Sequence, residues 1–80
     1  MSAELEDKVM IILTSILQIE QHKITLAKRG HTPEWDSMAW VNIIAALEDE
    51  FDVELNDDEY ELVSSYDLIC ELIKVKTQLI

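Results

Sequence analysis

Glycine, proline and cysteine each occur only once in this 80-residue chain. A β-rich fold uses glycine and proline in its many turns, so the scarcity of both argues against such a fold. A lone cysteine cannot form an internal disulfide, and a chain without disulfides fits a reducing compartment. Length and composition therefore predict one small domain that spans residues 1–80.

Long hydrophobic runs are also missing, because no uninterrupted apolar run exceeds five residues, as from Val9 to Leu13. A membrane-spanning helix needs about 20 apolar residues, so none is expected. The first residues contain no basic segment, and we expect no secretory signal. Ile, Leu, Val and Phe still supply 26 of the 80 residues, enough to build a folded core. We expect a soluble, cytoplasmic domain without membrane insertion.

Positive charge is absent from the middle of the chain, where no Lys or Arg occurs between Gly30 and Ile73. The same stretch holds 13 of the 17 acidic residues, and the net charge is −11. An acidic surface repels nucleic acid, which is a polyanion, and attracts basic patches of other proteins. A solvated surface that only maintains solubility is the alternative, but the segregation favours a partner surface. We expect a monomer. Because like charges repel, we also expect salt or divalent cations to raise its melting temperature.

Apolar residues at helical spacing predict an all-α fold, a small bundle of four helices. The expected helices are residues 3–19, 37–50, a short acidic turn or helix at 57–62, and 66–75. Asp36 suits the N-cap of the second helix, and Ser64 suits the start of the last. Residues 20–36 form a long loop between the first two helices, which we expect Ile24 and Leu26 to hold against the core. A loop of this length is often functional.

The helix at 37–50 carries two apolar faces when its residues are placed at 100° per step. One face must pack on the core and consists of Trp40, Ile43, Ile44, Leu47 and Phe51. The opposite face is apolar at its centre and polar or acidic at its margin, with Met38, Val41 and Ala45 bordered by Asn42, Glu48, Asp49 and Asp52. A helix of a small bundle needs only the first face, so the second is predicted to dock partners. Packing of the second face under the preceding loop is the alternative.

Ser37 begins this helix in the motif Trp35-Asp36-Ser37-Met38, and the acidic stretch Leu47-Glu48-Asp49-Glu50-Phe51 follows in register. Together with Val53-Glu54-Leu55 and Ser64-Ser65-Tyr66-Asp67, these residues resemble the acyl carrier proteins over about residues 35–73. Members of this family are small helical domains that carry 4′-phosphopantetheine on the serine of such a motif.

The resemblance implies a carrier without catalytic activity of its own. A phosphopantetheinyl transferase would attach the arm from coenzyme A to Ser37, beside the motif residue Asp36, and the thiol of the arm would hold an acyl group as a thioester. Acyl-loading and acyl-processing enzymes with basic patches would dock on the second helix, in fatty-acid synthesis or in specialised lipid or polyketide-type synthesis. The partner-binding residues would be Met38, Val41, Asn42, Ala45, Glu48 and Asp49, and the acyl pocket would be lined by Trp40, Ile43, Leu47 and Phe51.

Three residues depart from the family pattern. Trp35 stands where many members have a small residue, Trp40 replaces a small polar residue near the mouth of the acyl pocket, and Asn42 replaces a frequent glutamate. Our hypothesis is that Trp40 narrows the interior, so that long acyl chains are held poorly or stay exposed. These departures favour a dedicated biosynthetic pathway and leave a D-alanyl or peptidyl carrier open. An acidic helical adaptor without a prosthetic group also remains an alternative.

Other chemistry has less support in the sequence. A catalytic serine needs a base within reach, and no Gly-x-Ser-x-Gly motif surrounds Ser37. His22 and His31 lie in the preceding loop, without further ligands at the spacing of a metal site. The acidic stretch 52–63 lacks the glycine and the final glutamate of a calcium-binding loop, so no metal site is predicted. Cys70 is expected to be a small buried or half-buried hydrophobic residue.

Overall fold

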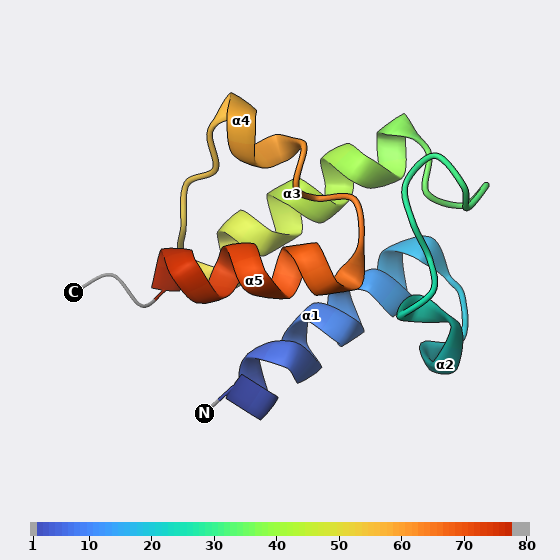
Figure 1. Ribbon diagram of the computed structural model, residues 1–80, viewed down its shortest axis with the longest axis horizontal. Coiled ribbons are helices and arrows are strands. Elements are labelled where there is room, and N and C mark those ends of the chain that lie inside the picture. The colour runs from blue at the N-terminus through green and yellow to red at the C-terminus, as the bar shows by residue number, and fades with distance from the viewer. Residues whose placement is uncertain (1, 78–80) are drawn as a thin grey trace.

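The computed structural model describes residues 2–77 and contains five helical segments (Figure 1). They are α1 (Ser2–Leu17), α2 (Gln21–Ile24), α3 (Ser37–Phe51), α4 (Asp57–Tyr60) and α5 (Tyr66–Thr77). Within this range no strand forms, and an isolated bridge between Lys28 and Ser65 is the one β-type pairing. The all-α prediction is confirmed, but the four-helix layout needs a correction, because α2 adds a helical turn within the expected loop. None of the helices in this range is long and apolar enough to cross a membrane.

Three buried residues, each four positions from the next, hold α1 in place: Val9 and Leu13 are fully buried, and Leu17 nearly so. This stripe packs against both α3 and α5, which lie above α1 in Figure 1. The helix ends two residues earlier than expected, because Gln18 adopts a left-handed φ of 57°. A residue in that conformation cannot continue a right-handed helix. Its N–H group still donates to the carbonyl of Thr14 at 2.9 Å, which completes the last turn of α1.

The core gathers aliphatic side chains from the three long helices and from the segments between them. The largest fully buried side chains are Val9, Leu13, Ile24, Ile43, Leu47, Val63, Ile69 and Ile73. Burial of one such side chain contributes about 1.5–3 kcal/mol. A small domain has a total free energy of unfolding of about 5–15 kcal/mol, so each of these positions matters to stability. Cys70 is buried with them, as expected.

The segment between α2 and α3 is held down by three side chains. Ile24, Ala27 and Trp35 are all at least 95% buried, whereas Leu26 is 79% exposed. The expectation for Ile24 is therefore confirmed and that for Leu26 is wrong. Residues three apart on a helical turn share a face, so the turn of α2 directs Ala27 inward together with Ile24 and turns Leu26 outward.

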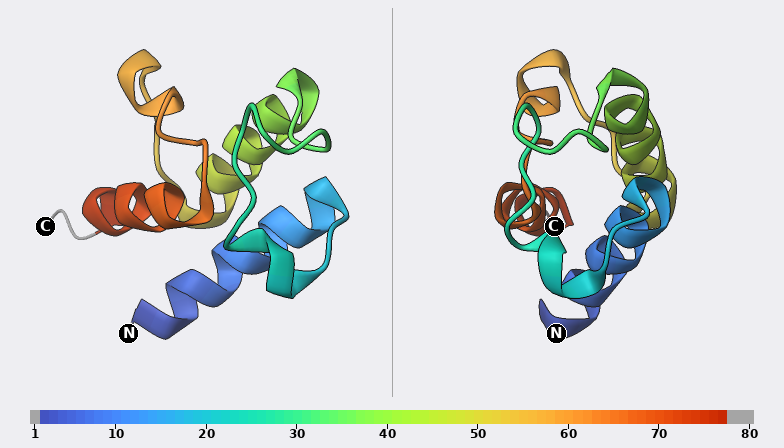
Figure 2. Two further views of the ribbon diagram at one scale, coloured as in Figure 1. Left: turned by 45° about the vertical axis from the view of Figure 1, so that its right-hand side comes forward. Right: turned by 90° about the vertical axis from the view of Figure 1, so that its right-hand side faces the viewer.

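The same segment is tied to the chain that leads into α5. The N–H group of Arg29 donates to the carbonyl of Ser64 at 2.8 Å, next to the bridge between Lys28 and Ser65. Gly30 follows with a φ of 95°, a conformation that residues with a side chain rarely adopt. Figure 2 shows this part of the chain rising from α2 toward the start of α3. The contact brings basic loop residues to the beginning of α5.

Side-chain caps start α4 and α5. The Asn56 side chain accepts from the N–H of Glu59, whose carboxylate accepts in turn from the N–H of Asn56, both at 3.0 Å. This capping box begins α4. The backbone hydrogen bond from Asn56 and, next, the hydrogen bond from Lys76 at 3.0 Å lower the pKa of the Glu59 carboxyl.

The cap of α5 differs from the expected one by a single residue. The Ser65 hydroxyl, and not that of Ser64, accepts from the N–H of Leu68 at 3.3 Å. The carbonyl of Ser64 is used by Arg29 instead. The buried face of α5 consists of Ile69, Cys70, Leu72 and Ile73.

Candidate functional site

Ser37 is the first residue of α3, and its side chain is exposed. Local sequence explains this placement, because Asp36 has an extended backbone and its Oδ1 accepts from the N–H of Ala39 at 2.8 Å. Such a cap pairs one of the N–H groups that every helix start leaves without an intrahelical partner. The carboxylate of Asp36 is therefore already bonded to the backbone at the start of α3. The Ser37 hydroxyl makes no hydrogen bond to another of residues 2–77.

The side of α3 predicted to dock partners is open to solvent. Met38 is 74% exposed and Val41 is 56% exposed, and Ala45 is exposed as well. The alternative, in which Met38 and Val41 pack under the preceding loop, is therefore wrong. At the margin of this face Asn42, Asp49 and Asp52 are exposed.

Glu48 differs from the other acidic residues of this margin because it is half-buried and already bonded. Its Oε2 accepts from the N–H of Leu55 at 2.9 Å, just after the end of α3. Asp52 ends the helix with a left-handed φ of 54°. The carboxylate of Glu48 thus holds the turn that follows α3, a role that the sequence did not reveal.

The opposite side of α3 is closed by packing. Ile43 and Leu47 are fully buried, whereas Trp40 and Phe51 are half-buried and lie against the core. The Trp40 Nε1 donates to the carbonyl of Tyr60 at 3.2 Å. The two aromatic rings meet edge to face, 6.2 Å apart and at 85°. Trp40 thereby joins the first turns of α3 to α4.

Arg29 covers the ring of the same tryptophan. Its guanidinium carbon lies 4.3 Å from the centre of the Trp40 ring, a cation–π contact. Arg29 and Trp40 are eleven residues apart, and no local pattern in the sequence pairs them. The backbone hydrogen bond from Arg29 to Ser64 ties the loop to the segment between α4 and α5, and the Arg29 side chain reaches Trp40 from there.

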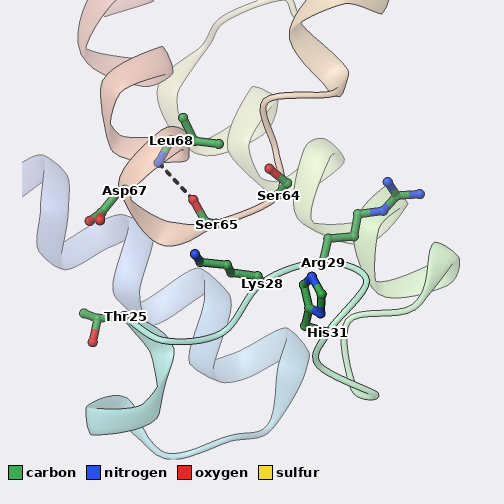
Figure 3. Close-up of a pocket in the computed structure, with 8 residues that line it drawn as sticks. All are labelled: Thr25, Lys28, Arg29, His31, Ser64, Ser65, Asp67 and Leu68. Carbon is green, nitrogen blue, oxygen red and sulfur yellow. Dashed lines mark hydrogen bonds between the residues drawn. The ribbon is translucent and has the colours of Figure 1, made fainter.

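Arg29 also lines a cavity of about 400 Å³ between the loop and the start of α5 (Figure 3). Three basic side chains of the loop, Lys28, Arg29 and His31, share this cavity with Ser65 and Asp67. In Figure 3 Lys28 points toward Ser65 and Arg29 extends the other way, with His31 between them. His31 looks like an ordinary loop residue in the sequence, and the cluster leaves no sequence signal because it forms only when the loop pairs with the start of α5.

Trp35 is buried just before the start of α3. Its side chain is 2% exposed and belongs to the core, so the tryptophan fills space beneath the segment that leads into α3. Its Nε1 is buried and has no hydrogen-bond partner among residues 2–77. A buried donor without a partner costs about 1–3 kcal/mol, which the large buried surface of the indole ring offsets.

Among residues 2–77, His22 is not part of a metal site. His22 pairs with Glu20, with 3.3 Å between Nε2 and Oε1, at the exposed surface of α2. Within the described range no three His, Cys, Asp or Glu residues are grouped so that they could hold a metal ion.

Known proteins identify the family. No protein-family model matches the chain. An acyl carrier protein of Clostridium acetobutylicum is 46% identical over 43 residues, which cover 54% of this chain and 56% of that protein. An acyl carrier protein of Akkermansia muciniphila is 34% identical over 74 residues, which cover 90% of this chain and 92% of that protein. This chain belongs to the acyl carrier proteins. The resemblance found in the sequence is confirmed, and the family supports a carrier role for this acyl carrier protein.

Proposed function

We propose that this acyl carrier protein carries 4′-phosphopantetheine on Ser37, attached by a transferase that takes the arm from coenzyme A. The observation that supports this site is the exposed Ser37 hydroxyl at the start of α3, beside an Asp36 carboxylate engaged as the helix cap. A serine that another enzyme modifies needs exposure and no base of its own. Once attached, the arm would supply a thiol that holds an acyl group as a thioester.

The exposed face of α3 is our candidate for the docking surface. Met38, Val41 and Ala45 offer an apolar centre, and Asn42 and Asp49 form its polar and acidic margin. Apolar contact supplies affinity, and the acidic margin steers the basic patches of a transferase or of acyl-loading and acyl-processing enzymes. Glu48 would contribute mainly by holding the turn after α3, through its hydrogen bond to Leu55.

The packing around Trp40 limits the length of acyl chain that the interior could hold. Ile43 and Leu47 are packed in the core, and the half-buried Trp40 is bonded to Tyr60 and covered by Arg29. A long acyl chain would have to displace these contacts to enter the core. We therefore propose short or exposed acyl groups as cargo, within fatty-acid synthesis or a specialised lipid or polyketide-type pathway. A D-alanyl or peptidyl carrier fits the same closed interior.

The intact mass of the protein tests the attachment site. The wild type and Ser37→Ala are incubated with coenzyme A and a broad-specificity phosphopantetheinyl transferase. We expect the wild type to gain one phosphopantetheine and Ser37→Ala to gain none. If two different transferases leave the folded wild type unmodified, the carrier arm on Ser37 is refuted, and an adaptor without a prosthetic group becomes the better interpretation.

A further inference from the structure

Arg29 lies close to the first turn of α3. Its guanidinium covers the Trp40 ring at 4.3 Å, and Trp40 follows Ser37 by three residues on the same helix. Side chains three apart on a helix are neighbours, with about 5–6 Å between their Cβ atoms. Helical side chains also lean toward the helix N-terminus, which for Trp40 is the direction of Ser37. A group attached to Ser37 would therefore emerge beside Arg29.

Among residues 2–77 Arg29 has no carboxylate partner, although the chain has a net charge of −11. Lys8, Lys74 and Lys76 each pair with a glutamate, whereas Arg29 forms no ion pair within 4.0 Å among residues 2–77. Arg29 is also the last Lys or Arg before the acidic stretch that reaches to Ile73. Residues 2–77 thus place an unpaired guanidinium next to a helix that has no cation of its own.

The position of Arg29 is fixed before any ligand arrives. Its backbone N–H donates to the carbonyl of Ser64 at 2.8 Å, and the neighbouring Lys28 forms a bridge with Ser65. A side chain that is already placed loses less conformational entropy when it binds an anion. Lys28 lines the adjoining cavity and adds to the positive potential of the loop.

From these contacts we infer that Arg29 binds the phosphodiester of an arm attached to Ser37. The inference rests on the proposed function, since it needs a phosphate ester on that serine. A phosphodiester carries one negative charge, and a guanidinium can donate two parallel hydrogen bonds to its oxygens. Without Arg29 the added charge would only increase the repulsion within an already acidic protein. Arg29 thereby couples the modification of Ser37 to the junction between the loop and α5.

Melting temperatures of the unmodified and the phosphopantetheine-loaded protein test this role. The wild type, Arg29→Gln and Lys23→Gln are each measured in both forms, after the intact mass has confirmed the loading. Lys23→Gln is the matched control, because Lys23 is an exposed cation of α2 that lacks an ion pair among residues 2–77 and lies outside the cavity lined by Arg29. At low salt we expect the change in melting temperature on loading to be about 2–4 °C more favourable in the wild type than in Arg29→Gln. Lys23→Gln should match the wild type, and about 1 M NaCl should shrink the difference.

A purely structural role of Arg29 would lower both forms equally and leave the change on loading unaltered, which would overturn the inference. An equal effect of Lys23→Gln would also overturn it, because the net charge alone would then explain the result. Loading should shift the NMR resonance of the Arg29 Nε–H group in the wild type. If Ser37 takes up no phosphopantetheine, the proposed function itself falls; if it does and Arg29→Gln behaves as the wild type, only this inference falls.

Discussion

At the scale of single residues, the start of α3 depends on one side-chain hydrogen bond. The Asp36 Oδ1 accepts from the N–H of Ala39 at 2.8 Å, and Ser37 takes its place at the first helical position as a result. Asp36→Ala removes the acceptor, so we expect the free energy of unfolding to fall by about 1 kcal/mol and the melting temperature by about 4–8 °C. Asp36→Asn keeps an acceptor and should retain most of this stability. Thermal unfolding followed by circular dichroism compares the variants, and equal losses in both would contradict the capping role.

Burial changes the pKa, and with it the reactivity, of the Cys70 side chain. Burial raises the pKa of the Cys70 thiol, and burial also raises the pKa of the neighbouring Tyr66 to about 12. Both folded-state values lie above the ordinary ones, so the stability they contribute is complete at neutral pH and is lost as the pH rises. Thiolate is the reactive form, and we expect Cys70 to react with an aromatic disulfide reagent at least about tenfold more slowly in the folded protein than in urea at about pH 8. Absorbance of the released thiolate measures both rates, and equal rates would show that Cys70 is accessible.

At the scale of elements, α3 was predictable and the loop before it only partly so. The apolar spacing of Ile43, Ile44 and Leu47 and the cap at Asp36 are local properties, and they placed α3 within one residue of its observed bounds. The single turn of α2 is too short to show a hydrophobic period, and the sequence therefore predicted loop there.

The errors in the loop have a common physical cause. Ala27 points inward in place of Leu26 because of the turn of α2. Ser65 caps α5 in place of Ser64 because the carbonyl of Ser64 pairs with the distant loop. The contact of Arg29 with Trp40 likewise depends on tertiary structure. Contacts between segments far apart in the chain leave no periodic signal in the sequence.

The exposed face of α3 should be separable from the core by substitution. Met38 is 74% exposed, so Met38→Glu should change the free energy of unfolding by no more than about 0.5 kcal/mol. If this face docks partners, the same change should lower the kcat/KM of the transferase for the carrier by about tenfold, because it places a charge at an apolar centre. Ile11→Glu is the matched control, since Ile11 is 62% exposed on α1 and outside this face. Urea unfolding and transferase kinetics are measured on both variants, and equal kinetic losses would place docking elsewhere.

At the scale of the whole molecule, the distribution of charge dominates. The chain has 17 acidic residues against six Lys and Arg, and only Lys8, Lys74 and Lys76 form salt bridges with carboxylates among residues 2–77. Repulsion among the acidic residues therefore exceeds the attraction that the few basic residues provide. This excess opposes the compact state. The same negative field attracts basic partners. The charge that speeds the encounter with a partner therefore also lowers the stability of the fold.

Screening this repulsion should stabilise the fold. Salt shortens the range of interactions between exposed charges, from about 30 Å at 0.01 M to a few ångströms near 1 M. Raising NaCl from about 10 mM to about 0.5 M should then raise the melting temperature by about 3–8 °C. Glu54→Gln and Glu61→Gln remove exposed carboxylates that have no ion pair among the described residues. Together they should raise the melting temperature at low salt and reduce its dependence on NaCl. A melting temperature that stays constant between low and moderate salt would mean that the acidic surface is compatible with the fold at no cost in stability, and its segregation would then have to be explained by partners alone.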